Sequence, residues 1–177
     1  KRRKFAKIMS EIYSNLKSLV ESNKELKITN IELIHDNLIL TCDRESLIQN
    51  IDTLKRNVEF KFRQLIDILG IDYPQKDKRF EVVYLFLSHE KNFRISLKIH
   101  IDENEIVPTL TGIFPSANWQ EREVFDMFGI KFADHPDLRR ILTDYEFEGY
   151  PLRKDFPLTG HKEVRYSAEH QKVIYEP

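Results

Sequence analysis

The sequence FEVVYLFLSHEKNFRISLKIHI, residues 80–101, carries the clearest structural pattern in this chain of 177 residues. Its second half alternates strictly, with Ile95, Leu97, Ile99 and Ile101 between Arg94, Ser96, Lys98 and His100. Such alternation is typical of a β-strand with one buried and one wet face. The first half is apolar for most of its length, which indicates a central strand. The stretch therefore predicts a hairpin of two strands, Phe80–Ser88 and Phe93–Ile101.

A helix, two strands and two more helices are predicted upstream of this hairpin. Apolar residues at steps of three and four indicate the helices, and short runs around a polar turn indicate the strands. Asp43 is expected to cap the second helix, since its carboxylate can accept hydrogen bonds from free N–H groups of the first turn. In chain order, the predicted elements are a helix over residues 5–20, strands at Lys27–Ile34 and Leu38–Cys42, a helix from about Arg44, and a helix from about Glu59 to Gly70.

Downstream of the hairpin, a strand is predicted at Val107–Phe114 and a helix at Ala117–Phe128. The helix lies between a start signal at Ser116 and a stop signal at Gly129. Grouped helices and hairpins are typical of an α+β domain. We therefore expect an α+β fold with a mixed sheet of about five strands covered by helices, followed by an extended irregular C-terminal strap.

Four charged residues of the last predicted helix have informative spacings. Glu121 and Glu123 are two residues apart, so they point to different sides of the helix. This argues against a carboxylate pair for acid–base catalysis. Arg122 and Asp126 are four residues apart and can form an ion pair within the helix.

The chain changes character towards its C-terminus. Five of the seven prolines lie after Ile113, and aromatic, charged and proline residues alternate from Tyr145 onward without a long helical or strand period. We expect residues 1–143 to form the α+β domain and residues 144–177 to form an extended tail that wraps a partner subunit. The alternative is a tail that packs back onto its own domain.

The composition excludes several classes of protein. A net charge of -1 gives no global basic field for nucleic acid, although residues 1–27 hold 8 basic and 3 acidic side chains. That excess could serve an acidic partner or an anionic membrane surface, or be a solvated helix face.

Cys42 stands alone, which excludes a disulfide framework and a cysteine-rich zinc or iron–sulfur site in this chain. No glycine-rich loop joins a predicted strand to a predicted helix, so the dinucleotide and phosphate-loop fingerprints are missing. The longest apolar run, Val82–Leu87, is far shorter than the roughly 20 residues of a membrane-spanning helix.

Two blocks of sequence resemble the signature of a known family. The first is EREVFDMFGI at residues 121–130 with HPDLRRIL at residues 135–142, and the second is PLRKDFPL at residues 151–158 with EVRY at residues 163–166. They are similar to the thirty-kilodalton subunit of respiratory complex I, the proton-pumping NADH:ubiquinone oxidoreductase. This protein is called the C subunit in bacteria and subunit nine where mitochondria encode it. The resemblance runs without a gap from about Ala117 to Tyr166.

The resemblance implies a non-catalytic structural and assembly subunit of the peripheral arm, in its quinone module. Its expected partners are the large quinone-module subunit and neighbouring iron–sulfur subunits, and no nucleic acid. It implies no cofactor in this chain, because flavin, iron–sulfur clusters and quinone belong to neighbouring subunits. The redox reaction from NADH to ubiquinone belongs to the assembly. The implied position is peripheral to the membrane. Abundant Ile, Lys and Asn often reflect an AT-rich genome, which favours a mitochondrion and therefore the matrix side of its inner membrane. The alternative is the cytoplasmic face of a bacterial plasma membrane.

The same blocks supply candidate residues for a protein interface. Arginine can form bidentate pairs with carboxylates of a partner, and Phe156 is held extended because a proline follows it. Arg139 and Arg140 diverge on a helical turn, so one is expected to reach the partner while the other braces its own domain. The predicted interface residues are Glu121, Arg122, Glu123, Arg139, Arg140, Arg153, Lys154, Asp155, Phe156, Arg165 and Tyr166.

Two other classes of function compete with this interpretation. A nucleic-acid-binding module would use the basic N-terminus, but it needs a continuous basic face, and the acidic loop Asp102–Glu105 argues against one. A stand-alone hydrolase would use Glu121, Glu123, Asp126 or His135. A capping or packing role is far commoner for a histidine in the position of His135.

Overall fold

The computed structural model describes residues 2–35, 37–159 and 163–176. Its centre is a mixed sheet of five strands in the order β1-β2-β5-β4-β3, in which β2 and β5 run parallel. β4 (Phe80–Ser88) and β5 (Phe93–Ile101) form the predicted hairpin with the predicted bounds. The predicted α+β fold with a five-stranded mixed sheet is confirmed. The other strands of the sheet are β1 (Asn30–Ile34), β2 (Asn37–Thr41) and β3 (Gln64–Asp72).

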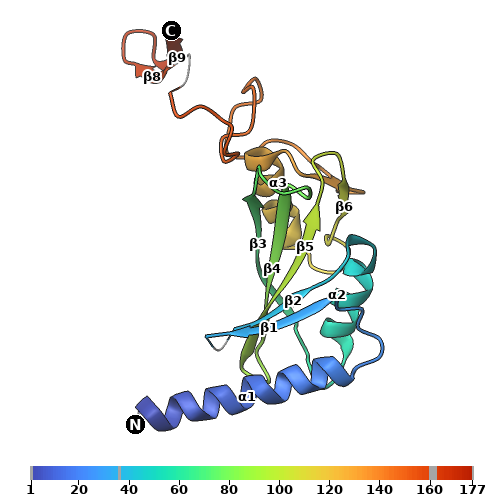
Figure 1. Cartoon of the computed structure of the whole chain (residues 1–177). Coiled ribbons are helices and arrows are strands. Elements are labelled where there is room, and N and C mark those ends of the chain that lie inside the picture. Colours follow the sequence, from blue (N-terminus) through green and yellow to red (C-terminus); the bar gives the residue numbers. More distant parts are fainter. Residues whose placement is uncertain (1, 36, 160–162, 177) are drawn as a thin grey trace.

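Helices lie at both ends and on one face of this sheet. Figure 1 shows α1 (Arg2–Ser22) at one end and α3 (Ala117–Phe128) at the other. The short helix η1 (Arg44–Ser46) leads into α2 (Leu47–Arg56), which covers a face of the sheet. Among the residues that the structure describes, no helix is both long and apolar enough to cross a membrane.

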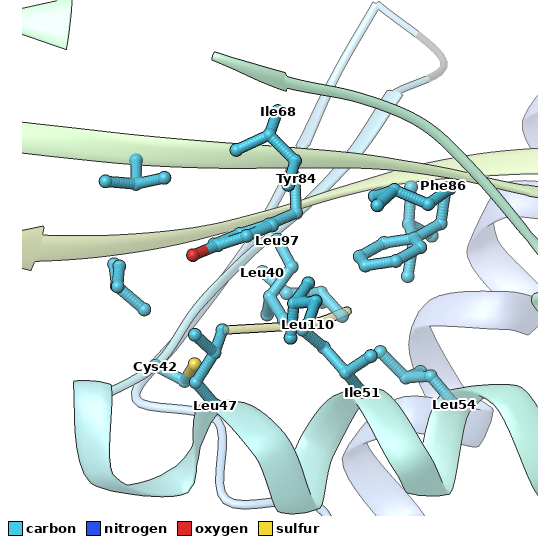
Figure 2. Packing of buried hydrophobic residues seen from close by; sticks show 14 of the residues in the cluster. Leu40, Cys42, Leu47, Ile51, Leu54, Ile68, Tyr84, Phe86, Leu97 and Leu110 are labelled. Atoms are coloured by element: carbon cyan, nitrogen blue, oxygen red, sulfur yellow. The ribbon is translucent and has the colours of Figure 1, made fainter. Parts of the chain in front are cut away.

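The hydrophobic core lies between α2 and the central strands. Figure 2 shows Leu47 and Ile51 of α2 pointing towards Leu40 of β2, Tyr84 of β4 and Leu97 of β5, and all five are at most 1% exposed. Full burial of one such aliphatic side chain contributes about 1.5–3 kcal/mol. The alternation of apolar and polar side chains in residues 93–101 thus places a continuous apolar layer against α2.

The helix predicted from about Glu59 to Gly70 is wrong, because residues 59–63 are irregular and the following residues form β3. A bulge at Ile66 shifts the register between Leu65 and Asp67, so that the buried residues Leu65 and Ile68 are three positions apart. A bulge places one extra residue in a strand, and a spacing of three resembles a helical period. The pairing of β3 with β4 decides the outcome over this local pattern.

Other boundaries differ from expectation in smaller ways. The strand expected at Val107–Phe114 is only the short β6 (Ile106–Pro108), which pairs in parallel with β7 (Lys131–Ala133). Asp43 and Ser116 stand at helix starts, but neither makes the expected side-chain capping bond. The expected stop at Gly129 is confirmed: its φ of 77° is left-handed, and its N–H bonds the Phe125 carbonyl at 2.8 Å.

The C-terminal segment is less irregular than expected. β8 (Glu163–Ser167) and β9 (Lys172–Glu176) form an antiparallel hairpin. This hairpin lies beyond α3, apart from the five-stranded sheet (Figure 1).

The packing of α3 against β3 depends on Gly70. A Cβ atom on this residue would lie 2.6 Å from Cδ2 of Phe128, closer than real contacts allow. We expect Gly70→Ala to lower the free energy of unfolding by about 1–3 kcal/mol, because the Phe128 ring would have to move. Urea denaturation would measure this change. Gly112→Ala is the matched control, since a Cβ atom there meets nothing within 4 Å, and an equal effect of both substitutions would contradict the packing argument.

Candidate functional site

The carboxylate of Asp126 on α3 holds the chain segment that follows β7. Its Oδ2 accepts the backbone N–H groups of Ile141, Leu142 and Thr143 at 2.7–2.9 Å. Its Oδ1 accepts the Thr143 hydroxyl at 2.5 Å and the Arg140 guanidinium at 2.7 Å. Asp126 is fully buried, and a buried charge is stable only when it is paired and hydrogen-bonded. These five donors therefore attach residues 140–143 firmly to α3.

The same hydrogen bonds keep Asp126 ionised. Burial alone would raise the pKa of this carboxyl group, but the hydrogen bonds from Thr143, Ile141 and Arg140 outweigh burial and hold the pKa well below its usual value.

Arg140 extends this attachment towards the C-terminal segment. Besides Asp126, its guanidinium donates to the Gly149 carbonyl at 2.9 Å. It also lies over the rings of Phe147 and Tyr150, at 5.7 and 5.4 Å from their centroids. One side chain thus connects α3 with residues 147–150.

A second attachment is built around Asp72 at the end of β3. Its buried carboxylate accepts both Nε (2.8 Å) and Nη2 (3.0 Å) of Arg79, and the backbone N–H of Lys154 at 2.7 Å. Arg79 also pairs with Asp155 at 2.8 Å. The hydrogen bond from Arg79 lowers the pKa of Asp72. Residues 154–155 are therefore held on the edge strand of the sheet.

Arg153 completes this second attachment. Its Nε donates to the Phe128 carbonyl at 2.6 Å, and its guanidinium lies 4.5 Å from the Tyr150 ring centroid and pairs with Glu103. A Cβ atom on Gly129 would lie 2.6 Å from the Tyr150 ring, so only glycine permits this approach. Residues 150–155 therefore pack back onto their own domain, which is the alternative considered for the tail.

The predicted interface residues on α3 divide into buried and exposed ones. Glu121 and Arg122 are buried within this chain, and the Arg122 guanidinium donates to the carbonyls of Arg139 and Arg140 at 3.0 Å. The predicted ion pair between Arg122 and Asp126 does not form, because Asp126 is surrounded by the donors of residues 140–143. Glu123 is exposed on the outer side of the helix.

The predicted interface residues that follow α3 also differ in exposure. The side chain of Arg140 is 15% exposed and braces its own domain, whereas that of Arg139 is 59% exposed and pairs with Asp137 at the surface. Lys154 presents its side chain to solvent although its backbone is bound. Phe156 is half-buried and stacks on Phe147 at a centroid distance of 5.9 Å.

Arg165 and Tyr166 lie on the β8–β9 hairpin. Arg165 pairs with Glu176 across the hairpin, while Tyr166 lies opposite Val173 and is 65% exposed. Val164 and Tyr175 form the adjacent pair on the same face, since residues two apart on a strand share a face. An isolated two-stranded hairpin is at best marginally stable in water, so its exposed apolar face is a candidate contact surface.

Exposed apolar side chains are concentrated in the last part of the chain. Eight of the sixteen large hydrophobic residues that are exposed in the described part of the chain lie between positions 142 and 175. Exposed apolar patches mark interaction sites. The eight are Leu142, Tyr145, Leu152, Leu158, Val164, Tyr166, Val173 and Tyr175.

The residues of the possible hydrolase do not form an accessible catalytic group. Glu121 and His135 approach to 3.9 Å, but both side chains are fully buried. Asp126 is occupied by its five donors, and Glu123 lies on another side of α3.

A comparison with known families identifies the chain. A sequence profile described as "Respiratory-chain NADH dehydrogenase, 30 Kd subunit" matches residues 40–162. The chain belongs to this family, the 30 kDa subunit of respiratory complex I. The match runs from β2 through both attachments of the C-terminal segment.

Curated bacterial relatives are closely similar over most of the chain. The C subunit of the NADH-quinone oxidoreductase of Sinorhizobium medicae is 50% identical over 96% of this chain and 84% of its own length. The C subunit of the same enzyme from Dinoroseobacter shibae is 48% identical over 96% of this chain and 79% of its own. That of Ruegeria pomeroyi is 57% identical over 75% of this chain and 66% of its own.

A solved structure shares the fold of this chain. It is a chain of "the membrane-bound sulfane sulfur reductase (MBS), an archaeal respiratory membrane complex", with a TM-score of 0.65. The match covers 82% of this chain and 85% of that chain at 24% identity, so it supports the architecture alone.

Two carboxylates that hold the C-terminal segment are not predicted as such from the sequence. The spacing on α3 predicts Asp126 only as an ion-pair partner within that helix, and Asp72 lies outside the predicted helices and strands. A carboxylate seven residues before Arg79 was the available signal. It did not say that Asp72 would also bind the segment around Lys154, which is 82 positions away.

Loss of the Asp126 carboxylate is expected to destabilise the chain strongly. Asp126→Asn leaves Arg140 buried without its counter-ion, and breaking such a pair costs about 3–5 kcal/mol. The free energy of unfolding, measured by urea denaturation near neutral pH, should fall by this amount. Since the folded pKa is depressed, this stabilisation is present above the ordinary Asp value of about 3.9 and is lost as the pH falls through the folded pKa.

Asp137→Asn is the matched control for this measurement. Asp137 also pairs with an arginine, Arg139, but at the surface, where such a pair contributes at most about 1 kcal/mol. Similar losses in the two variants would show that burial of Asp126 is unimportant.

Proposed function

We propose that this chain is a structural and assembly subunit of the peripheral arm of proton-pumping NADH:quinone oxidoreductase, within its quinone module. In this proposal it supports electron transfer from NADH to quinone without a catalytic residue of its own. The single observation that carries the proposal is the concentration of exposed apolar side chains at positions 142–175 in a member of a multisubunit complex.

The two attachments support a division of the C-terminal segment. Asp126 and Asp72 fix residues 140–143 and 153–155 to the domain, which gives the following residues a defined starting point. Leu158, Val164 and Tyr166 beyond that point are 57–105% exposed. Protein interfaces are enriched in buried aromatic side chains, and we assign this role to Phe156 and Tyr166, with the exposed Leu158 as an aliphatic anchor in the same segment.

The expected partner of this surface is the large subunit of the quinone module, with the iron–sulfur subunits as further neighbours. Among the predicted interface residues, we retain Glu123, Arg139, Lys154, Asp155, Phe156, Arg165 and Tyr166 as candidates. The side chains of Glu121, Arg122, Arg140 and Arg153 are largely buried by contacts within the chain, so we leave them out of the proposed contact surface.

We place the protein at the surface of an energy-converting membrane. The relatives reported above are bacterial, and they support the cytoplasmic face of a bacterial plasma membrane. The mitochondrial location expected from the composition stays a prediction that these relatives do not test.

Substitution of the proposed anchors should impair assembly rather than catalysis. Leu158→Ala and Tyr166→Ala should each weaken association by about 1–2 kcal/mol, or about 5- to 30-fold. The measurement is the amount of assembled complex recovered from detergent-solubilised membranes, together with quinone reduction per assembled complex. The first should fall, and the second should stay near the wild-type value.

Val58→Ala is the matched control, because Val58 is also apolar and 67% exposed but precedes β3, outside positions 142–175. Its complex should assemble normally. If assembly is unchanged in the Leu158 and Tyr166 variants while quinone reduction per complex collapses, the segment is catalytic and the structural role is refuted.

We further propose that the chain binds neither flavin nor an iron–sulfur cluster. Its single cysteine, Cys42, is buried, and desolvation raises the pKa of its thiol, which disfavours the thiolate that a cluster needs. An absorbance spectrum of the purified 177-residue chain should show no visible bands. Flavin or cluster bands that persist after gel filtration would contradict this proposal.

A further inference from the structure

Glu121 occupies a different environment from Asp126, although both lie on α3. Its carboxyl group is fully buried and faces the segment between β6 and α3. Oε1 accepts the backbone N–H of Leu110 at 2.7 Å, and Oε2 lies 2.5 Å from the hydroxyl of Thr109. Both partners are uncharged, so nothing in these contacts balances a negative charge.

His135 is the basic side chain that approaches Glu121, and both of its ring nitrogens are engaged with the backbone. Its Nδ1 accepts the backbone N–H of Asp137 at 3.0 Å and therefore carries no proton. The single ring proton of this tautomer is on Nε2, which lies 3.0 Å from the Asn118 carbonyl and donates to it. Although Nε2 is 3.9 Å from Oε2 of Glu121, His135 supplies no positive charge without losing the bond from Asp137.

The other elements around Glu121 offer no cation either. From β4, Tyr84 presents a buried hydroxyl that has no hydrogen-bond partner, and the buried thiol of Cys42 at the end of β2 is near Tyr84. On α3 itself, Arg122 directs its guanidinium to the carbonyls of residues 139 and 140. From α2, Lys55 donates to the Ile113 carbonyl at 2.5 Å. Among the described residues, no ion pair of Glu121 with Lys or Arg is found.

The hydroxyl groups beside Glu121 can serve both of its protonation states. The Thr109 hydroxyl lies 2.5 Å from Oε2 of Glu121 and 3.1 Å from the Thr111 hydroxyl. When Glu121 is ionised, Thr109 donates to the carboxylate. When Glu121 carries a proton, the acid donates to Thr109, which turns its own proton towards Thr111. The ionised form thus keeps these hydrogen bonds, but it places a negative charge in a buried site without a balancing cation, and such a charge is costly.

We propose that Glu121 is a proton-binding site which holds residues 109–111 against α3 in its neutral, protonated form and loosens this contact when it ionises. This pH-sensitive contact lies in the first half of α3 and connects residues 109–111, α3 and the turn at His135.

The energetics agree with this geometry. Burial raises the pKa of Glu121 to about 7, and the hydrogen bonds from Leu110 and Thr109 offset only part of that effect. In the unfolded chain a glutamate has its ordinary pKa of about 4.3. Between these two values the folded chain binds one more proton than the unfolded chain. Stability due to this group is therefore complete below the lower value and is lost as the pH rises through about 7.

The first test compares the pH dependence of folding in wild type, Glu121→Gln and Glu123→Gln, using the 177-residue chain. Glutamine has the shape of the protonated acid, and its amide N–H can donate a hydrogen bond as the acid O–H does, but it cannot ionise. Relative to Glu121→Gln, the wild-type folding equilibrium constant should fall about tenfold per pH unit from about pH 5 to about pH 7. Glu123→Gln changes an exposed carboxylate on the same helix and should follow the wild type. Parallel curves for wild type and Glu121→Gln would overturn the proposal.

The second test observes the proton directly and does not depend on the folding of Glu121→Gln. Infrared spectra of the wild-type chain in D₂O should show the C=O band of a buried carboxylic acid that disappears with a midpoint near pH 7. Thr109→Val removes a hydrogen bond that favours the carboxylate, so it should shift the band and move the midpoint to higher pH. Absence of the band at about pH 5, or a midpoint that Thr109→Val leaves unchanged, would refute the assignment.

Discussion

The buried carboxylate of Asp126 is the constraint on which the C-terminal half of this protein depends. A charge that is removed from water must be paired and hydrogen-bonded, or the fold loses several kcal/mol. Every donor that compensates Asp126 comes from residues 140–143. The chain after β7 therefore has to return to α3, and Arg140 is brought to the position from which it contacts Phe147, Gly149 and Tyr150.

Asp72 repeats the same arrangement at the edge of the sheet. It binds Arg79 through both carboxylate oxygens and takes the backbone N–H of Lys154 as a further donor. The two carboxylates thus hold the chain against α3 and the sheet as far as residues 154–155. The apolar residues that follow are exposed. Because the preceding residues are held firmly against the domain while these are not covered, we infer that they contact another subunit of the complex.

Glu121 and Asp126 show how the same helix can hold two acids in opposite states. Asp126 has an arginine and four further donors, so its pKa is depressed. Glu121 has two neutral donors and, among the described residues, no Lys or Arg partner, so burial dominates and raises its pKa to about 7. Five residues along α3 therefore separate a structural anion from a neutral acid.

The sequence by itself determined the central hairpin of the sheet, the helix at Ala117–Phe128 and the family. Strict alternation in residues 93–101 reflects a strand with one buried face, and this local pattern gave the hairpin its bounds. Gly129 could be recognised as a helix end because the left-handed backbone there favours glycine. Only the tertiary structure decided that residues 64–72 are a strand, because a bulge gives their buried side chains a spacing that also fits a helix. Only the tertiary structure decided that Arg140 and Arg153 turn inwards, since their partners, Asp126 and the Phe128 carbonyl, lie 14 and 25 positions away. Long-range pairing of this kind leaves no periodic trace in the sequence, because the geometry that selects each partner exists only after the sheet and α3 have packed together.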